Sequence, residues 1–198
     1  MKHFSTKLLA WYELHKRSLP WRQTKDPYVV WLSEIILQQT RVEQGLPYFE
    51  RFLKDFPTID DLAQASEDAI LKRWQGLGYY SRARNLHKAA KQLSEQYKGN
   101  FPSTYKELLK LPGVGPYTAR AIASICFDEV CAVVDGNVYG VLARHFNNFN
   151  PINKSKGIKA FQVLAQSLID PNSPGTYNQA IMEFGALHCT PKNPDCTT

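Results

Sequence analysis

Two carboxylic residues, Glu34 and Asp135, stand where they could cleave a glycosidic bond. Glu34 lies in the middle of the apolar segment 28–39 (YVVWLSEIILQQ), and Asp135 directly follows the apolar run Val130–Val134. A carboxyl group in apolar surroundings has a raised pKa, which is how a glutamate becomes a general acid near neutral pH. An ionised aspartate can stabilise a sugar cation in a site of low dielectric. Together they would form the two-carboxylate arrangement that cleaves glycosidic bonds.

Each carboxylate also has an ordinary structural explanation. Glu34 could lie on the one solvated edge of a buried helix, or bond to a basic partner. Asp135 is followed by Gly136 and Asn137, and an aspartate at the start of a helix commonly caps it. Neither residue decides between the two interpretations without its context.

A glycine turn in the segment 111–119 (LPGVGPYTA) is the third informative feature. Pro112 lacks an N–H group and Gly113 and Gly115 permit positive φ, so the chain must turn here. A turn that opens a helix points free backbone N–H groups outward, which suits a phosphate. The alternative is an ordinary corner between two helices.

The elements that position these residues are predicted to be helices. Segment 28–39 should be a helix that is buried on most faces, started by Asp26 and Pro27. Helical spacing also runs from Pro116 onward and through 156–168. The run Val130–Val134 resembles a strand but has no partner to pair with. The pattern predicts an all-α protein of about ten helices.

Segment 79–97 is predicted to form an amphipathic helix. Its apolar stripe consists of Tyr80, Ala83, Leu86, Ala90, Leu93 and Tyr97. Its polar face consists of Arg84, His87, Lys88 and Lys91, and would meet either solvent or phosphate groups.

Composition describes a folded protein that could bind a polyanion. The 198 residues suffice for one core or for two small lobes, and 43% of them are hydrophobic. Lys and Arg exceed Asp and Glu by 24 to 18, giving a formal charge of +6. We expect a cytoplasmic protein without a signal peptide or membrane span, whose thiols stay reduced. Cys126 and Cys131 are then expected in the core.

Several motifs together resemble the helix–hairpin–helix DNA glycosylases of the endonuclease III superfamily. They are WLSEIILQQTRV, GLGYYSRARNLHKAA, LPGVGPYTA and VVDGNV, and the match runs from Leu19 to Cys196. The adenine-specific branch is the most similar. The resemblance implies two helical lobes with the active site in the cleft between them. One lobe would be a six-helix barrel at 28–135, with its helix–hairpin–helix motif at about 105–127, and the other would combine 1–27 with 136–198.

The resemblance also implies roles for individual residues. Glu34 would protonate the adenine leaving group, Asp135 would stabilise the oxocarbenium ion, and Asn137 would help to hold that site. Tyr117 stands where the glycosylases with lyase activity carry a lysine, so a monofunctional enzyme is implied. The residues implied to bind substrate or DNA are Arg22 and Gln179 in the adenine pocket, Gln39, Leu77 and Tyr79 in the base stack, and Gly113, Val114 and Gly115 at a phosphate. The glycines on both sides of Leu77 favour its exposure, although a leucine is more often core.

The cysteines Cys189 and Cys196 match the first two ligands of the family's four-cysteine iron–sulfur motif. The sequence ends at Thr198, one residue before the third cysteine is expected. A [4Fe–4S] cluster with two thiolates lacks half its ligands. We therefore expect the iron–sulfur loop to be truncated, the cluster to be absent or incomplete, and the family's C-terminal 8-oxoguanine-recognition domain to be absent.

The function implied is base-excision repair by a monomeric enzyme in the bacterial cytoplasm, associated with the nucleoid. Its partner would be double-stranded DNA with adenine mispaired with 8-oxoguanine or guanine. Two alternatives remain open at this point. The chain could be an endonuclease III-like pyrimidine glycosylase with AP lyase activity, or a DNA-binding module without catalysis.

Overall fold

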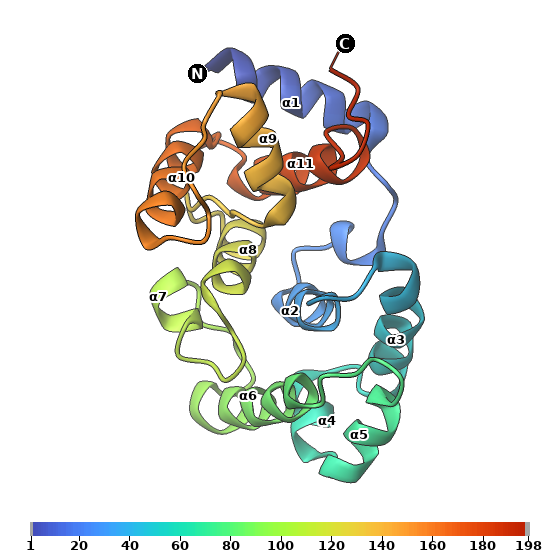
Figure 1. The fold of residues 1–198 in the computed structure, drawn as a ribbon. Coiled ribbons are helices and arrows are strands. Elements are labelled where there is room, and N and C mark those ends of the chain that lie inside the picture. Colours follow the sequence, from blue (N-terminus) through green and yellow to red (C-terminus); the bar gives the residue numbers. More distant parts are fainter. Residues whose placement is uncertain (1, 197–198) are drawn as a thin grey trace. The chain divides into compact units, whose positions relative to one another are not determined.

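The computed structural model describes residues 2–196, and within them it is helical (Figure 1). The helices are α1 (Lys2–His15), the 3-10 helix η1 (Pro20–Arg22), α2 (Pro27–Ile36), α3 (Val42–Asp55), α4 (Ile59–Gln64), α5 (Glu67–Trp74), α6 (Ser81–Tyr97), α7 (Tyr105–Leu108), α8 (Pro116–Phe127), α9 (Gly136–His145), α10 (Ser155–Leu168) and α11 (Pro174–Leu187). No strand occurs in this range, which confirms the predicted all-α class. None of the described helices is long and apolar enough to cross a bilayer.

The chain divides into two compact units, residues 19–122 and residues 1–18 with 123–198. Both boundaries come earlier than those expected from the sequence, at 28 and 135. Helix η1 packs on α2, and its Trp21 ring lies 5.0 Å from the ring of Phe49 on α3. At the other boundary, Asn178 donates to the hydroxyl of Ser124. These contacts, which lie within single units, place η1 in the first unit and the end of α8 in the second.

Helix α2 is the centre of unit 19–122. It begins as predicted, because the Asp26 carboxylate accepts a hydrogen bond from the Tyr28 N–H at 2.8 Å and Pro27 occupies the first turn. Its contacts are with η1, α3 and α6. The buried residues of α2 are Tyr28, Val30, Trp31, Leu32, Ser33, Ile35 and Ile36. The prediction of a helix buried on most faces is confirmed.

Helix α6 confirms most of its predicted stripe but corrects two residues. Tyr80, predicted in the apolar stripe, lies just before the helix and is 38% exposed. Ala83, Leu86, Ala90 and Leu93 are buried, while His87, expected on the polar face, is only 3% exposed. The reason is that α4 packs closely along α6 and covers this side as well. Burial then lowers the pKa of His87, and the nearby charge of Lys91 adds to this effect.

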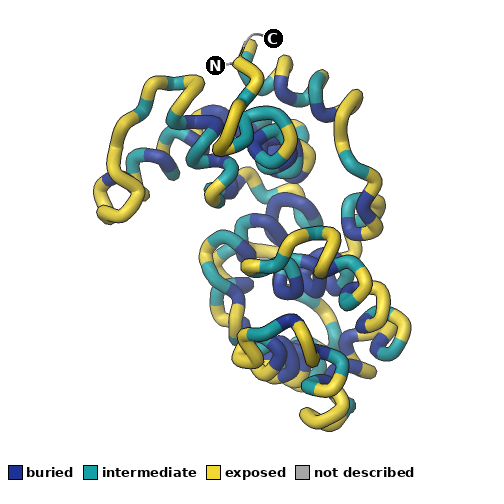
Figure 2. Tube along the Cα trace, turned by 45° about the vertical axis from the view of Figure 1, so that its right-hand side comes forward, coloured by how far each residue is buried: buried dark blue, intermediate teal, exposed yellow. Residues whose placement is uncertain are grey.

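Helix α11 is the centre of unit 1–18 with 123–198, where it packs against α1 and α9. Its Glu183 is 1% exposed, and the Glu183 carboxylate accepts hydrogen bonds from Nε and Nη2 of Arg17, at 2.9 and 2.6 Å. A buried carboxylate is tolerated only when it is paired in this way. In both units, the helices carry both buried and exposed residues (Figure 2).

Candidate active site

Glu34 lies on a partly exposed edge of α2. It is half-buried, whereas every other residue from Val30 to Ile36 is buried. The full burial that its apolar neighbours suggested is therefore only partly realised, because the edge of α2 at Glu34 is incompletely covered. A carboxyl group at such an edge has a rigid support and can still reach a molecule outside the core. Its role as an acid remains a prediction.

Asp135 is the N-cap of α9, so its structural explanation is correct. One carboxylate oxygen accepts the Val138 N–H at 2.8 Å, and the other accepts the side-chain amide of Asn137 at 3.0 Å. Burial raises the pKa of Asp135, and the hydrogen bonds from Val138 and Asn137 oppose that rise. The two bonds also fix the direction of the carboxylate. Capping and a catalytic role are therefore compatible.

The extended run 130–134 leads directly into Asp135 and is held by a buried amide. Asn178 on α11 is fully buried. Its carbonyl oxygen accepts the Val133 N–H at 3.1 Å, and its amide donates to Ser124 Oγ at 2.8 Å and to the Cys131 carbonyl at 2.9 Å. These bonds satisfy backbone N–H and carbonyl groups that a neighbouring strand would satisfy in a sheet.

Two glutamines on α10 complete this support. Gln166 accepts the Ala132 N–H at 2.9 Å and donates to the Val130 carbonyl at 2.8 Å. Gln162 donates to the Ala132 carbonyl at 2.8 Å. Residues 162 and 166 are four apart and so share one face of the helix. That spacing was the one signal in the sequence for this arrangement, and it was missed.

Replacing Asn178 with Ala should lower the free energy of unfolding by about 2–3 kcal/mol, since several buried groups lose their partner at once. Urea denaturation followed by circular dichroism measures this loss. Replacing the exposed Gln166 with Ala is the matched control, with an expected loss of about 1 kcal/mol or less because water can replace its bonds. Equal losses for the two variants would contradict the assigned role of Asn178.

Asn137 is held in place by a close approach of α9 and α11. A Cβ atom added at Gly185 would lie 2.7 Å from the Asn137 Cβ and 2.8 Å from its carbonyl oxygen. Such contacts cannot be accommodated without a shift of one helix. A glycine at position 185 is therefore what lets α11 pack against the residue that bonds to Asp135.

Replacing Gly185 with Ala should lower the free energy of unfolding by about 1–3 kcal/mol and displace Asn137. Thermal denaturation measures the first effect. Gly140→Ala is the control, because its added Cβ would meet only a side-chain atom of Arg144 at 3.9 Å. That change should be neutral or slightly stabilising, since alanine is the better helix former. Similar effects at 185 and 140 would rule out the steric account.

The glycine turn joins α7 to α8 as predicted. Gly113 is exposed with φ 76°, and a Cβ atom there would lie 2.8 Å from the Asn85 Cβ. Val114, by contrast, is 6% exposed and donates its N–H to the Leu111 carbonyl. Val114 therefore anchors the turn, and its N–H is already used, so a phosphate would rely on Gly113, Gly115 and the first turn of α8.

The residues expected around the base stack divide between two turns of unit 19–122. Gln39 is exposed with φ 54°, and Tyr79 is 66% exposed with φ 47°. Leu77 is only 6% exposed, so the expectation of an exposed tip was wrong. The turn folds back on Trp74. The Trp74 carbonyl accepts a hydrogen bond from the Leu77 N–H, and the Trp74 indole N–H donates to the Gly78 carbonyl at 2.9 Å.

The remaining predicted side chains are half-buried. Tyr117 occupies the first turn of α8, and Arg22 lies in η1. Gln179 on α11 accepts the hydroxyl of Tyr12 at 3.2 Å. Tyr12 is 2% exposed and was not predicted. Its bond orients the Gln179 amide, whose role in a base pocket remains a prediction.

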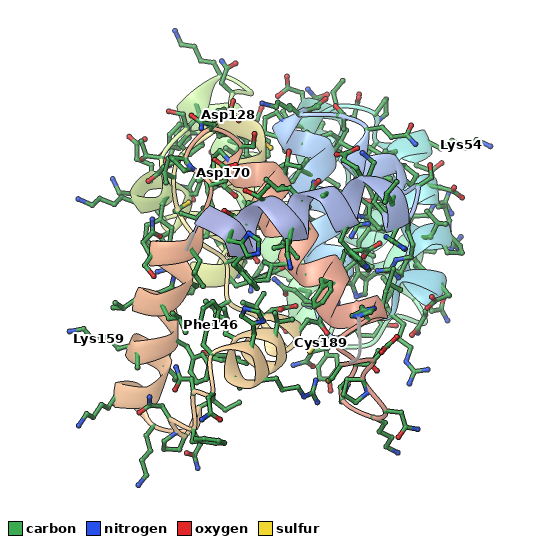
Figure 3. All side chains as sticks on the ribbon, turned by 90° about the horizontal axis from the view of Figure 1, so that it is seen from above. Lys54, Asp128, Phe146, Lys159, Asp170 and Cys189 are labelled. Atoms are coloured by element: carbon green, nitrogen blue, oxygen red, sulfur yellow. The ribbon has the colours of Figure 1, made fainter. Side chains whose placement is uncertain are left out.

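Cys189 follows α11 (Figure 3), and its carbonyl and Sγ both contact Nη1 of Arg144, at 2.9 and 3.2 Å. Cys196 is exposed. Among residues 2–196, no group of three or more His, Cys, Asp or Glu side chains is placed to hold a metal ion. The described segment after α11 thus offers two thiols where a [4Fe–4S] cluster needs four ligands, and these residues do not fit a complete cluster.

Comparison with known proteins identifies the family. The profile of the HhH-GPD superfamily of base excision DNA repair proteins matches residues 32–166. The chain belongs to this superfamily. The matched range contains Glu34, the glycine turn, Tyr117 and Asp135, so the predicted helix–hairpin–helix family is confirmed. The matched range also spans residues of both compact units.

Curated relatives of this HhH-GPD protein include adenine DNA glycosylases. That of Buchnera aphidicola subsp. Schizaphis graminum is 41% identical over 194 residues, which cover 98% of this chain and 56% of the relative. That of Homo sapiens is 43% identical over 203 residues, which cover 98% of this chain and 37% of the relative. The chain thus spans little more than half of one relative and less than half of the other.

Solved structures agree on the fold. A thermostable thymine-DNA glycosylase is 30% identical with a TM-score of 0.88, and the match covers 98% of this chain and 90% of that one. An endonuclease III in a non-covalent DNA complex is 22% identical with a TM-score of 0.80, covering 98% and 88% of the two chains. The second likeness supports the fold alone.

Proposed function

We propose that this chain removes adenine from double-stranded DNA by hydrolysing its N-glycosidic bond. The names of the curated relatives support adenine as the base. The observation that carries the proposal is the carboxylate of Asp135, half-buried and held in one direction by Val138 and Asn137. A fixed anion of this kind is suited to a sugar cation.

The proposed reaction takes place on a nucleotide that has left the base stack. Glu34 donates a proton to the adenine ring, which turns the base into a good leaving group. The bond between the base and C1′ then breaks with its electron pair going to the base. Asp135 stabilises the resulting oxocarbenium ion until water adds to C1′ and loses a proton.

Tyr117 supports a monofunctional enzyme. A phenol at this position cannot form a Schiff base with the sugar, whereas a lysine amine can. The competing hypothesis is a glycosylase with lyase activity, similar to endonuclease III. It predicts a covalent protein–DNA adduct after borohydride treatment, and the proposed function predicts none.

Recognition of the mispair is proposed to involve the turn that contains Gln39, the turn that contains Tyr79, and the glycine turn at 111–119. Gln39 and Tyr79 would enter the stack around the guanine or 8-oxoguanine opposite the adenine, which offsets the cost of unstacking. Backbone N–H groups at Gly113 and Gly115 would bind a phosphate and so fix register without reading sequence. The surplus of positive charge, +6 for the whole chain, supports a polyanionic partner. We propose that the chain acts as a monomer.

The test is a single-turnover assay on duplexes with one adenine opposite 8-oxoguanine, guanine or thymine. Strand cleavage after alkali reports the abasic product. We expect product with 8-oxoguanine and guanine, and little with thymine. Tight binding without product would favour the DNA-binding module, while cleavage without alkali would favour the lyase.

A further inference from the structure

Arg82, in the first turn of α6, joins two turns that are far apart in the sequence. Its guanidinium reaches the end of α2 and the residues that follow it on one side, and the turn before α6 on the other. Nη1 lies within hydrogen-bond distance of the carbonyl oxygens of Ile35 (3.2 Å), Ile36 (3.0 Å) and Gln38 (2.5 Å) and of the Thr40 hydroxyl (3.4 Å). Nη2 donates to the carbonyl oxygens of Leu77 (3.1 Å) and Gly78 (3.4 Å).

These acceptors are carbonyl and hydroxyl oxygens rather than carboxylates. The carbonyls of Ile35 and Ile36 belong to the last turn of α2, which is the negative end of that helix and favours a cation. The guanidinium also lies 5.0 Å from the Trp74 ring. Partial burial lowers the pKa of Arg82 from its usual value, yet an arginine stays charged. The charge of Arg82 therefore stabilises the backbone carbonyl groups of the two turns.

Each turn presents one exposed residue in the left-handed conformation, Gln39 with φ 54° and Tyr79 with φ 47°. That conformation is costly for residues other than glycine, and it persists where the surroundings enforce it. Arg82 bonds to the Gln38 carbonyl directly before Gln39 and to the Gly78 carbonyl directly before Tyr79. The guanidinium thus fixes the peptide that precedes each strained residue.

We infer that Arg82 is a positioning residue that holds the Gln39 turn and the Tyr79 turn together as one rigid wedge for the DNA duplex. The use of the wedge rests on the proposed function, but the joining of the turns does not. A planar fork with several fixed donors can bond to both turns at once. A lysine at this position has the charge but a single nitrogen, and it cannot span them.

The first test uses the protein without DNA. Hydrogen exchange should accelerate about tenfold or more in Arg82→Lys and Arg82→Gln at both Thr40 and Leu77, whose N–H groups close the two turns on Leu37 and Trp74. Arg84→Gln is the matched control, since Arg84 lies on the same helix but pairs with Glu67 at the surface. Acceleration in only one turn, or in neither, would overturn the inference. If Arg82→Gln does not fold, the exchange rates of Arg82→Lys alone decide the test.

The second test uses DNA. The probe is a duplex with a non-cleavable 2′-fluoro adenine nucleotide opposite 8-oxoguanine and 2-aminopurine as its neighbour. Insertion of a wedge unstacks the neighbour and raises its fluorescence. We expect the amplitude at saturating protein to fall at least threefold in Arg82→Lys and to stay unchanged in Arg84→Gln.

The outcomes separate the two claims. An unchanged amplitude in both Arg82 variants would overturn the positioning role, because wedging would then not need the guanidinium. A wild-type protein that leaves the fluorescence unchanged would count against the proposed function. The exchange measurement would still decide whether Arg82 joins the turns.

Discussion

Replacing Glu34 with Gln should lower the single-turnover rate of adenine release by about 10²- to 10⁴-fold, the usual contribution of a general acid. Glutamine keeps the shape of the side chain but has no acidic proton to give to the leaving base. The half-buried edge of α2 should accept this change without loss of folding. Rapid-quench assays on a duplex with adenine opposite 8-oxoguanine measure the rate.

Two controls isolate the chemical step in that experiment. Glu50→Gln changes an exposed glutamate on α3 in the same unit and should leave the rate unchanged. Fluorescence anisotropy with non-cleavable duplex should give the same affinity for Glu34→Gln and for the wild-type chain. A normal rate in Glu34→Gln would remove it from the mechanism, and lost affinity would make it a binding residue.

Replacing Asp135 with Asn should lower the rate of adenine release by about 10²- to 10³-fold, as loss of a preorganised charge does in other enzymes. Asparagine is also a good N-cap, so the bond to the Val138 N–H can remain. The Asn137 amide can turn over to accept from the new side chain. We therefore expect the free energy of unfolding at neutral pH to stay within about 1 kcal/mol of the wild-type value.

The pH dependence of stability provides a separate check on Asp135. Burial raises its pKa in the folded state above the ordinary value of 3.8. The folded chain then holds this proton more tightly than the unfolded chain does. The contribution of Asp135 to stability is therefore present below pH 3.8 and is lost as pH rises through the raised pKa. Urea denaturation between pH 3.5 and pH 7, in steps of about half a unit, should show a smaller loss in Asp135→Asn than in the wild-type chain. Equal losses would contradict the assignment.

The fold was predictable where local rules act alone. Asp26 and Pro27 start α2 through capping and a fixed φ, and helical spacing locates the stripe of α6 from Ala83 to Leu93. The helix after Asp135 also follows from its cap. Each of these features depends on residues within one or two helical turns of each other.

The errors arose where a tertiary contact decides the outcome. His87 has the polarity of a surface residue, but α4 covers it. Leu77 stands between two glycines, but its turn folds onto Trp74. Periodicity describes one helix at a time, so it carries no information about which neighbour covers the second face.

The supporting polar residues were missed for a similar reason. Asn178 bonds to Val133, which lies 45 residues earlier, and Arg82 bonds to Gln38, which lies 44 residues earlier. From sequence alone, an asparagine or an arginine on a helix is predicted to face solvent. Only the fold shows which carbonyl groups it contacts. The proposed catalytic residues and Asn137 could be named from motifs, whereas Asn178 and Arg82 could not.

The central claim is that this chain hydrolyses the glycosidic bond of adenine without a covalent intermediate. Its most direct test is one single-turnover reaction on a duplex with adenine opposite 8-oxoguanine, sampled with and without borohydride. The account predicts free adenine, an abasic strand that breaks only in alkali, and no trapped protein–DNA adduct. A borohydride-trapped adduct, or the absence of free adenine from a duplex that the chain binds, would contradict it.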